Sequence, residues 1–259
     1  MARYSANVNV MIKAIEKAAR NLVRDFGEVE QLQISVKGPS DFVTAADKRA
    51  ESILQEELSH ARPGFGFLME EGGEIKGREN ARWIIDPLDG TANFIKGIPY
   101  WCTTVALEQD GEITAGVTYN PISDELFWAE KGVGAYKRFQ RLRVSGTKDA
   151  KLATIGVGDN MPATPIENYY GKLEKIEARF AKSRNFGASA LDLAYVAAGQ
   201  FDAYWCQGFQ PWDCAAGILL IREAGGVITT IENKPDVLNS DNCVAGNSLM
   251  QAELLKIVK

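Results

Sequence analysis

The segment Trp83–Phe94, with the sequence WIIDPLDGTANF, ends an apolar run in two carboxylates, Asp86 and Asp89. A buried strand that ends in acids delivers them to the edge of its sheet, where ligands bind in α/β folds. Pro87 restricts the turn and removes a backbone donor, and Gly90 allows a ligand to approach the backbone closely. The alternative is a structural turn in which Asp86 accepts backbone amides. The segment by itself leaves both interpretations open.

Two further apolar segments are bordered by acids. Residues 65–69 lead into Glu70 and Glu71, for which a solvated turn is the alternative, and Asp213 opens an apolar helix, for which an N-cap is the alternative. Acids brought together repel one another unless cations lie among them. Oxygen ligands without cysteine or histidine favour Mg²⁺, Mn²⁺ or Ca²⁺. The turn after Asp89 suits an anion held by backbone amides.

The composition argues against several other classes of protein. The single histidine, His60, and the absence of a CxxC pair among four cysteines argue against a zinc site and against Ser-His-Asp catalysis. The net charge of −5 argues against a general nucleic-acid-binding surface. The sequence shows neither an apolar run of membrane-spanning length nor the apolar core of a signal peptide, so we expect a cytoplasmic protein.

The hydrophobic periodicity predicts a mixed α/β fold whose two halves differ. The first half, about residues 1–150, shows two amphipathic helices and then a mainly antiparallel sheet with two hairpins. The second half, about residues 151–259, alternates strands with helices. The predicted helices cover residues 4–25, 42–59, 166–181, 189–198, 212–223 and 247–258, the last with Asn247 as N-cap. The predicted strands cover residues 82–85, 103–107, 113–119, 125–129, 134–137, 201–205, 227–230 and 243–245.

Taken together, these motifs resemble the inositol monophosphatase family, which comprises magnesium-dependent, lithium-sensitive phosphatases related to fructose-1,6-bisphosphatase. The resemblance rests first on Asp86-Pro-Leu-Asp-Gly-Thr91 and Trp212-Asp-x-Ala-Ala-Gly217. It extends in order over nearly the whole chain, through segments 41–47, 184–192, 201–204 and 223–226. Glu70-Glu71 falls on the family's Gly-Glu-Glu, with Met69 in place of the glycine. The resemblance implies one domain over residues 1–259, a layered αβαβα sandwich, and a homodimer.

The resemblance also assigns roles to individual residues. It places two or three Mg²⁺ ions, or Mn²⁺ as a substitute, on Glu70, Asp86, Asp89, Asp213 and the carbonyl of Leu88. It makes Glu70 and Thr91 orient the attacking water, with Asp47 holding Thr91. The groups that it places around the substrate are Asp89, Gly90, Thr91, Arg184, Ser189, Cys206 and Asp213. Lys37 and Glu71 are expected to support the metal ligands.

The activity implied is hydrolysis of a small phosphate monoester, inositol 1-phosphate first, by direct attack of a metal-activated water. Inositol-specific members carry a glutamate seven residues before the aspartate of the Trp-Asp pair, where this chain has Cys206, a weak hydrogen-bond partner. Histidinol phosphate, fructose-1,6-bisphosphate and 3′-phosphoadenosine 5′-phosphate therefore stay open as substrates. Arg184 is either an ordinary surface residue or a contact to an acidic substrate group or a partner chain.

A covalent mechanism and a purely binding role are the two alternatives to this activity. An aspartyl nucleophile of the Asp-x-Asp-x-Thr type requires an acid two residues before Asp89, where this chain has Pro87. A folded relative that serves only as a regulatory or binding partner would not need every acid of the set.

Overall fold

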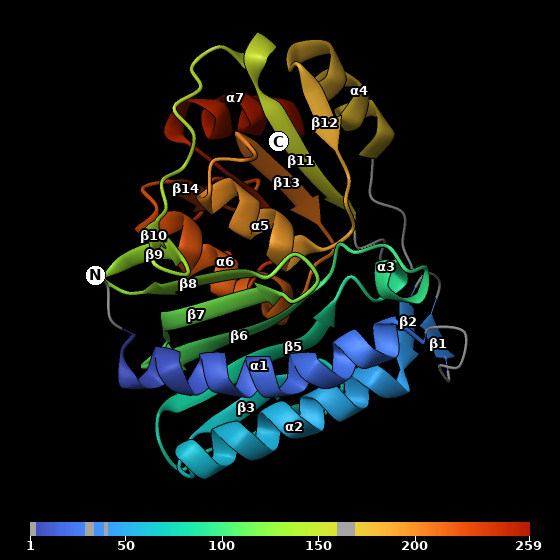
Figure 1. Cartoon of the computed structure of the whole chain (residues 1–259). Coiled ribbons are helices and arrows are strands. Elements are labelled where there is room, and N and C mark those ends of the chain that lie inside the picture. Colours follow the sequence, from blue (N-terminus) through green and yellow to red (C-terminus); the bar gives the residue numbers. More distant parts are fainter. Residues whose placement is uncertain (1–3, 29–33, 39–40, 160–168) are drawn as a thin grey trace.

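The computed structural model describes residues 4–28, 34–38, 41–159 and 169–259, which form alternating layers of helix and sheet (Figure 1). The order is helix, sheet, helix, sheet, helix, with hydrophobic clusters between the successive layers. This is the mixed α/β sandwich that the sequence predicts. Among the described helices, none is long and apolar enough to cross a membrane. The prediction of a single domain over residues 1–259 stays a prediction.

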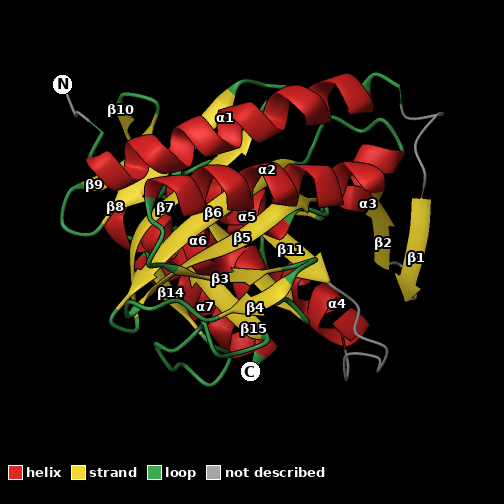
Figure 2. Ribbon diagram, turned by 90° about the horizontal axis from the view of Figure 1, so that it is seen from below, coloured by secondary structure: helices red, strands yellow, loops and turns green. Residues whose placement is uncertain are grey.

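The first helix layer consists of α1 (Ala6–Phe26) and α2 (Ala45–Ala61), which lie side by side across one face of the larger sheet (Figure 2). Ser5 caps α1 by accepting the amide of Val8 at 3.3 Å. The apolar residues of α1 recur at helical spacing, so one face is buried against the sheet and α2.

The larger sheet has the strand order β10-β9-β8-β7-β6-β5-β3-β4 and is antiparallel except where β3 pairs with β5. Its strands are β3 (Gly66–Met69), β4 (Gly73–Ile75), β5 (Ala81–Asp89), β6 (Cys102–Gln109), β7 (Glu112–Asn120), β8 (Glu125–Glu130), β9 (Gly134–Lys137) and β10 (Gln140–Arg141). The short helix α3 (Thr91–Ile95) follows β5 directly. The strands β1 (Ile34–Gly38) and β2 (Asp41–Thr44) form a separate antiparallel pair within the described part of the chain.

The middle layer consists of α5 (Ser189–Ala197) and α6 (Pro211–Glu223), which are packed between the two sheets. Nearly every residue of α6 after its first turn is apolar, as expected of a helix buried on all sides. The second sheet has the order β12-β11-β13-β15-β14, and α4 and α7 cover its outer face. The elements of this half are β11 (Thr154–Asp159), α4 (Tyr169–Arg179), β12 (Lys182–Arg184), β13 (Ala203–Gln207), β14 (Val227–Thr229), β15 (Asn242–Gly246) and α7 (Ser248–Val258), preceded by the 3-10 turn η2 (Ala150–Leu152).

The structure corrects two predicted boundaries. The helix predicted over residues 42–59 begins only at Ala45, because residues 41–44 form β2. The strand predicted over residues 82–85 continues to Asp89, with an irregular register against β6 between Asp86 and Asp89. The N-cap predicted at Asn247 is confirmed, since its side chain accepts the amides of Leu249 and Met250. The sequence of residues 158–165 is the nearest that the chain comes to a seam between its halves, and residues 160–165 of it lie outside the described residues.

Candidate metal centre

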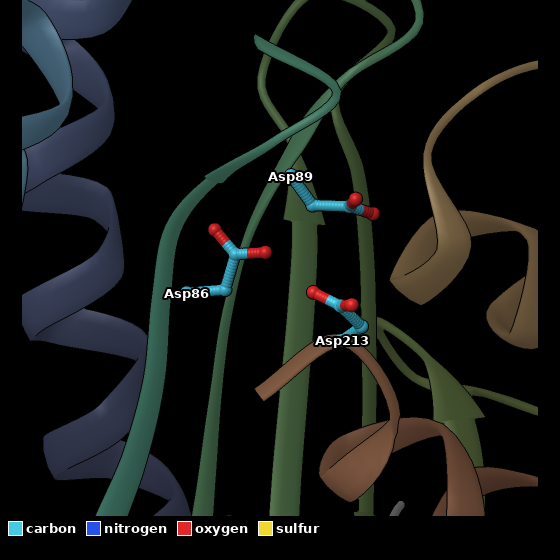
Figure 3. A group of neighbouring side chains, drawn as sticks. All are labelled: Asp86, Asp89 and Asp213. Carbon is cyan, nitrogen blue, oxygen red and sulfur yellow. The ribbon is translucent and has the colours of Figure 1, made fainter. Parts of the chain in front are cut away.

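Three aspartates meet where the end of β5 lies beside the start of α6 (Figure 3). One carboxylate oxygen from each of Asp86, Asp89 and Asp213 lies within 4.8 Å of the others. The three residues are only 2%, 8% and 7% exposed. Buried carboxylates at this spacing are unusual unless a cation or protons lie among them.

Backbone amides hold each of the three side chains. Asp86 Oδ1 accepts the amide of Leu88 at 2.9 Å, and Asp213 Oδ2 accepts the amide of Gln210 at 2.8 Å. Gln210 is therefore the N-cap of α6, and Asp213 is the third helical residue in a capping box. Asp86 thus accepts a backbone amide, as the structural alternative predicts, whereas the N-cap predicted at Asp213 is wrong, because Gln210 holds that position. A carboxylate held by one oxygen can present the other to a metal ion.

Asp89 is held from the middle layer and from the neighbouring strand. Its Oδ2 accepts the amide of Ala190, in the first turn of α5, at 2.8 Å, and the thiol of Cys102 at 3.7 Å. Cys102 stands opposite Asp89 in the register of β5 and β6. Neither contact was predicted, because nothing in the sequence tells which strand lies beside β5.

Burial and mutual repulsion make the charged form of the cluster costly. Burial, and then the charges of Glu70, Asp89 and Asp213, raise the pKa of Asp86 well above its usual range. Burial raises the pKa of Asp89 to about 7, although the amide of Ala190 opposes the shift. The three hard oxygen donors fit a divalent cation such as Mg²⁺, whose charge would offset this cost.

Glu70 reaches the same cluster from β3. Its amide bonds to the carbonyl of Ile85 at 3.3 Å, which keeps the residue beside β5 where that strand approaches Asp86. The carboxylates of Glu70 and Asp86 interact directly, and this contact contributes to the raised pKa of Asp86. Met69 is buried in the core. The turn after β3 therefore places Glu70 with the aspartates rather than on a solvated surface.

Thr91 begins α3, two residues beyond the end of the strand that carries two of the aspartates. Its hydroxyl lies 3.2 Å from Asp47 Oδ1 and 3.0 Å from the carbonyl of Leu88, and its single hydrogen can be donated to either. Asp47 is 1% exposed, in the first turn of α2. Gly90 has φ of 90°, and a Cβ there would lie 3.1 Å from the carbonyl oxygen of Tyr100. The turn therefore requires glycine.

The remaining predicted substrate groups differ in accessibility. Ser189 and Cys206 are 4% and 0% exposed, and their side chains lie 3.9 Å apart inside the core. The hydroxyl of Tyr204 donates to Ser189 Oγ at 3.2 Å. Burial raises the pKa of Cys206 to about 12. A direct contact of the Cys206 thiol with substrate does not match this burial, because the thiol packs among the residues of the α5–α6 layer.

Arg184 and the two predicted supporting residues have different surroundings. Arg184 is exposed at the end of β12, where its guanidinium donates to the carbonyl of Ser183 at 2.7 Å. The amide of Glu71 donates to Glu51 Oε2 at 2.9 Å, a contact that the sequence reasoning missed. The side chain of Lys37 lies outside the described part of the structure.

Comparison with known proteins identifies the relatives of the chain. The model of the inositol monophosphatase family matches residues 3–259. An inositol-1-monophosphatase of Mesorhizobium japonicum is 50% identical, with 100% of this chain and 98% of that protein covered. The Nus factor SuhB of Escherichia coli is 38% identical, with 93% of this chain and 91% of that protein covered. The extragenic suppressor protein suhB of Bartonella henselae is 50% identical in sequence. Its crystal structure matches this fold with a TM-score of 0.95, and the match covers 98% of this chain and 99% of that chain.

Proposed function

The chain belongs to the inositol monophosphatase family and is a phosphate monoester hydrolase, and we propose that it hydrolyses inositol 1-phosphate with Mg²⁺ as its metal ion. The observation that carries the proposal is the convergence of three buried aspartate oxygens within 4.8 Å. A phosphate monoester is an anion, so attack on its phosphorus by water requires neutralisation of charge. The family is metal-dependent, and the relative from Mesorhizobium japonicum, 50% identical over the full chain, is an inositol-1-monophosphatase.

The metal ligands of the proposal are Asp86, Asp89, Asp213, Glu70 and the carbonyl of Leu88. All are oxygen donors, as Mg²⁺ prefers, and Mn²⁺ accepts the same set. We propose two or three ions, as the family resemblance implies. When bound, the ions neutralise phosphate charge, acidify water and stabilise the leaving oxygen.

Thr91 and Glu70 are proposed to hold the attacking water. When Thr91 donates its hydrogen to Asp47, at 3.2 Å, its oxygen is left to accept a hydrogen from water. The Glu70 carboxylate, at the end of the neighbouring strand β3, provides a second hydrogen-bond acceptor for the water. Two acceptors fix the orientation of the water, and orientation accounts for much of the catalysis in phosphoryl transfer.

The phosphate is proposed to rest on the amides of Gly90 and Thr91. The first amides of a helix have no partner within the helix, and α3 begins at Thr91. The left-handed conformation of Gly90 sets the direction of this turn. Arg184 is proposed as a contact to an acidic substrate group or to a partner chain.

Substrate preference is proposed to be broad. Ser189 and Cys206 bond within the core, and neither supplies the carboxylate of inositol-specific members. A site without a dedicated polar contact discriminates weakly between small esters. Histidinol phosphate, fructose-1,6-bisphosphate and 3′-phosphoadenosine 5′-phosphate are therefore alternative substrates.

The test is a phosphate-release assay over these four esters and 2-glycerophosphate, with Mg²⁺ or with EDTA. The variant Asp213→Asn serves as the inactive control. We expect release that depends on Mg²⁺, with inositol 1-phosphate among the best substrates. Release from every ester at the level of the control would refute the proposal. Direct attack forms no phosphorylated protein, whereas an aspartyl nucleophile would form an aspartyl-phosphate that can be trapped by acid quenching.

A binding role is the second candidate, because the 38% identical relative from Escherichia coli is named a Nus factor. Catalysis and binding are compatible in one chain. Absence of activity on all the esters, in protein that still binds Mg²⁺, would favour the binding role. The homodimer and the cytoplasmic location stay predictions, and light scattering of the purified protein tests the first of them.

A further inference from the structure

Helix α2 carries two buried carboxylates on the face toward the metal centre. Asp47 and Glu51 are four residues apart, so they lie one above the other on the same side of the helix. They are 1% and 7% exposed. Carboxylates are seldom buried unless they are bonded, and both of these have partners in the site. The first partner is Thr91, as described above.

Glu51 bonds to the turn that carries Glu70. Its Oε2 accepts the amide of Glu71 at 2.9 Å. Since Glu71 follows Glu70 directly, this bond fixes the backbone on the far side of Glu70. The near side is fixed by the bond from the Glu70 amide to the carbonyl of Ile85, at 3.3 Å. Glu70 is thus held on one side by the sheet and on the other by Glu51.

The turn is also packed closely against Glu51. A Cβ placed on Gly72 would lie 3.0 Å from Glu51 Oε1 and 2.8 Å from the terminal methyl of Met69. The next residues, in β4, have exposed side chains, and β4 closes the turn by pairing with β3. Helix α2 packs along β5, and the bond from Thr91 to Asp47 joins its first turn to α3. One helix therefore contacts both turns that bear water-holding residues.

We infer that Glu51 is a positioning residue, which holds Glu70 in place as Asp47 holds Thr91. The inference rests on the proposed function of Glu70 and Thr91. A shift of about 1 Å in a group that orients a reactant costs about 10²-fold in rate. Residues that support metal ligands affect metal affinity by about 10–100-fold. Glu51 acts through the backbone of the turn and touches neither substrate nor metal.

The test uses two substitutions and a control from the same helix. Glu51→Gln keeps an acceptor for the Glu71 amide, whereas Glu51→Ala removes it. Glu57→Ala removes an exposed carboxylate of α2 that pairs with Lys17 at 2.6 Å. For Glu51→Ala we expect kcat to fall about 10–100-fold, KM to change less than about threefold, and Mg²⁺ affinity in calorimetry to fall about tenfold. Glu51→Gln and Glu57→Ala should stay within about threefold of the original protein in all three quantities.

Several outcomes would overturn the inference. Glu51→Ala with a lowered Tm but unchanged kcat and Mg²⁺ affinity would make Glu51 a structural residue only. Glu51→Gln as impaired as Glu51→Ala would show that the hydrogen bond is not the link. If Glu51→Ala does not fold, Gly72→Ala displaces the turn from Glu51 while α2 stays intact, and unchanged kcat and affinity in that variant would also overturn it.

Failure of the proposed function gives a different result. The unaltered protein would then release no phosphate from any ester. The calorimetric comparison of Mg²⁺ affinity would still decide whether Glu51 positions Glu70, because it requires no turnover.

Discussion

Replacing Asp213 with asparagine should stabilise the metal-free protein at alkaline pH. The substitution removes one negative charge from the cluster. It keeps a side-chain oxygen that can accept the amide of Gln210, which Asp213 Oδ2 accepts at 2.8 Å. The helix cap is therefore retained. Mutual repulsion in the cluster is the contribution that the substitution is designed to change.

The size of the effect follows from the geometry. Two unit charges about 4.8 Å apart repel by about 3 kcal/mol at an effective dielectric constant of about 20. Partial protonation relieves some of this repulsion, so we expect a gain of about 1–3 kcal/mol in unfolding free energy at about pH 8. For a chain of this size that is a rise in Tm of about 2–10 °C.

The raised pKa values determine in which direction the stability of the metal-free protein changes with pH. Asp86 and Asp89 have pKa values in the folded protein above the unfolded value of 3.8. The native state therefore retains protons that the unfolded chain has released, and the stability of the metal-free protein falls as pH rises from about 4 through about 7. At about pH 5 Asp89 carries a proton, so Asp213 meets less repulsion there. The advantage of the variant should then be smaller.

The assay is thermal unfolding in EDTA at about pH 5, 6.5 and 8, repeated with Mg²⁺ in excess. Mg²⁺ should reverse the order of stability, because the original protein binds the ion more tightly. Asp149→Asn is the matched control, since Asp149 is exposed and accepts the amide of Lys151 at 2.9 Å. A variant that is destabilised in EDTA equally at pH 5 and pH 8 would refute the electrostatic reasoning.

Three further predictions concern single positions. Thr91→Val keeps the shape but removes the hydroxyl that is proposed to hold water, so kcat should fall by about 10²–10⁴ in steady-state assays, and a raised KM with unchanged kcat would assign Thr91 to substrate binding instead. Gly90→Ala forces a Cβ to 3.1 Å from the carbonyl of Tyr100 in a left-handed conformation, so Tm and kcat/KM should both fall, and an unchanged kcat/KM would contradict the phosphate-binding turn. Cys206→Glu places a carboxylate where the residue is 0% exposed, so Tm should fall. The ratio of inositol 1-phosphate turnover to 2-glycerophosphate turnover should stay constant. A shifted ratio at unchanged Tm would return Cys206 to the substrate site.

The sequence predicts which aspartates come together, because acids at strand and helix ends are a local signal. Asp86, Asp89 and Asp213 all occur at such ends, and all three meet. Hydrophobic periodicity predicts the elements in which it is strong, such as α1 and α7. It does not predict β2, which is only four residues long and whose Phe42 and Val43 also fit the helical pattern that continues into α2.

What the sequence could not give is the facing of individual side chains. Strand alternation permits Cys206 to face either side of its sheet, and only packing against α5 decides between them. Glu51 lies among other acids in the sequence of α2, a pattern typical of a solvent-exposed helix face. Its spacing of four residues from Asp47 was a usable signal, because it places both acids beside the buried Ala46, Ala50 and Leu54 stripe.

The position of Asp213 depends on how α6 docks between the sheets. Gly116, which lies in β7 and is not one of the proposed metal ligands, should therefore affect Mg²⁺ affinity. A Cβ on Gly116, in β7, would lie 2.9 Å from Cα and 3.1 Å from Cβ of Ala216, about one turn along α6 from Asp213. Because the first of these atoms belongs to the helix backbone, α6 itself must move to accommodate the Gly116→Ala methyl group. Cores transmit such displacements, since they are closely packed. We expect Mg²⁺ affinity to fall about 3–10-fold and Tm to fall by several degrees, with overpacking costing about 1–3 kcal/mol. Calorimetry and thermal unfolding on the same variant separate the two effects, and a lowered Tm with unchanged Mg²⁺ affinity would show that the metal centre does not depend on the docking of α6.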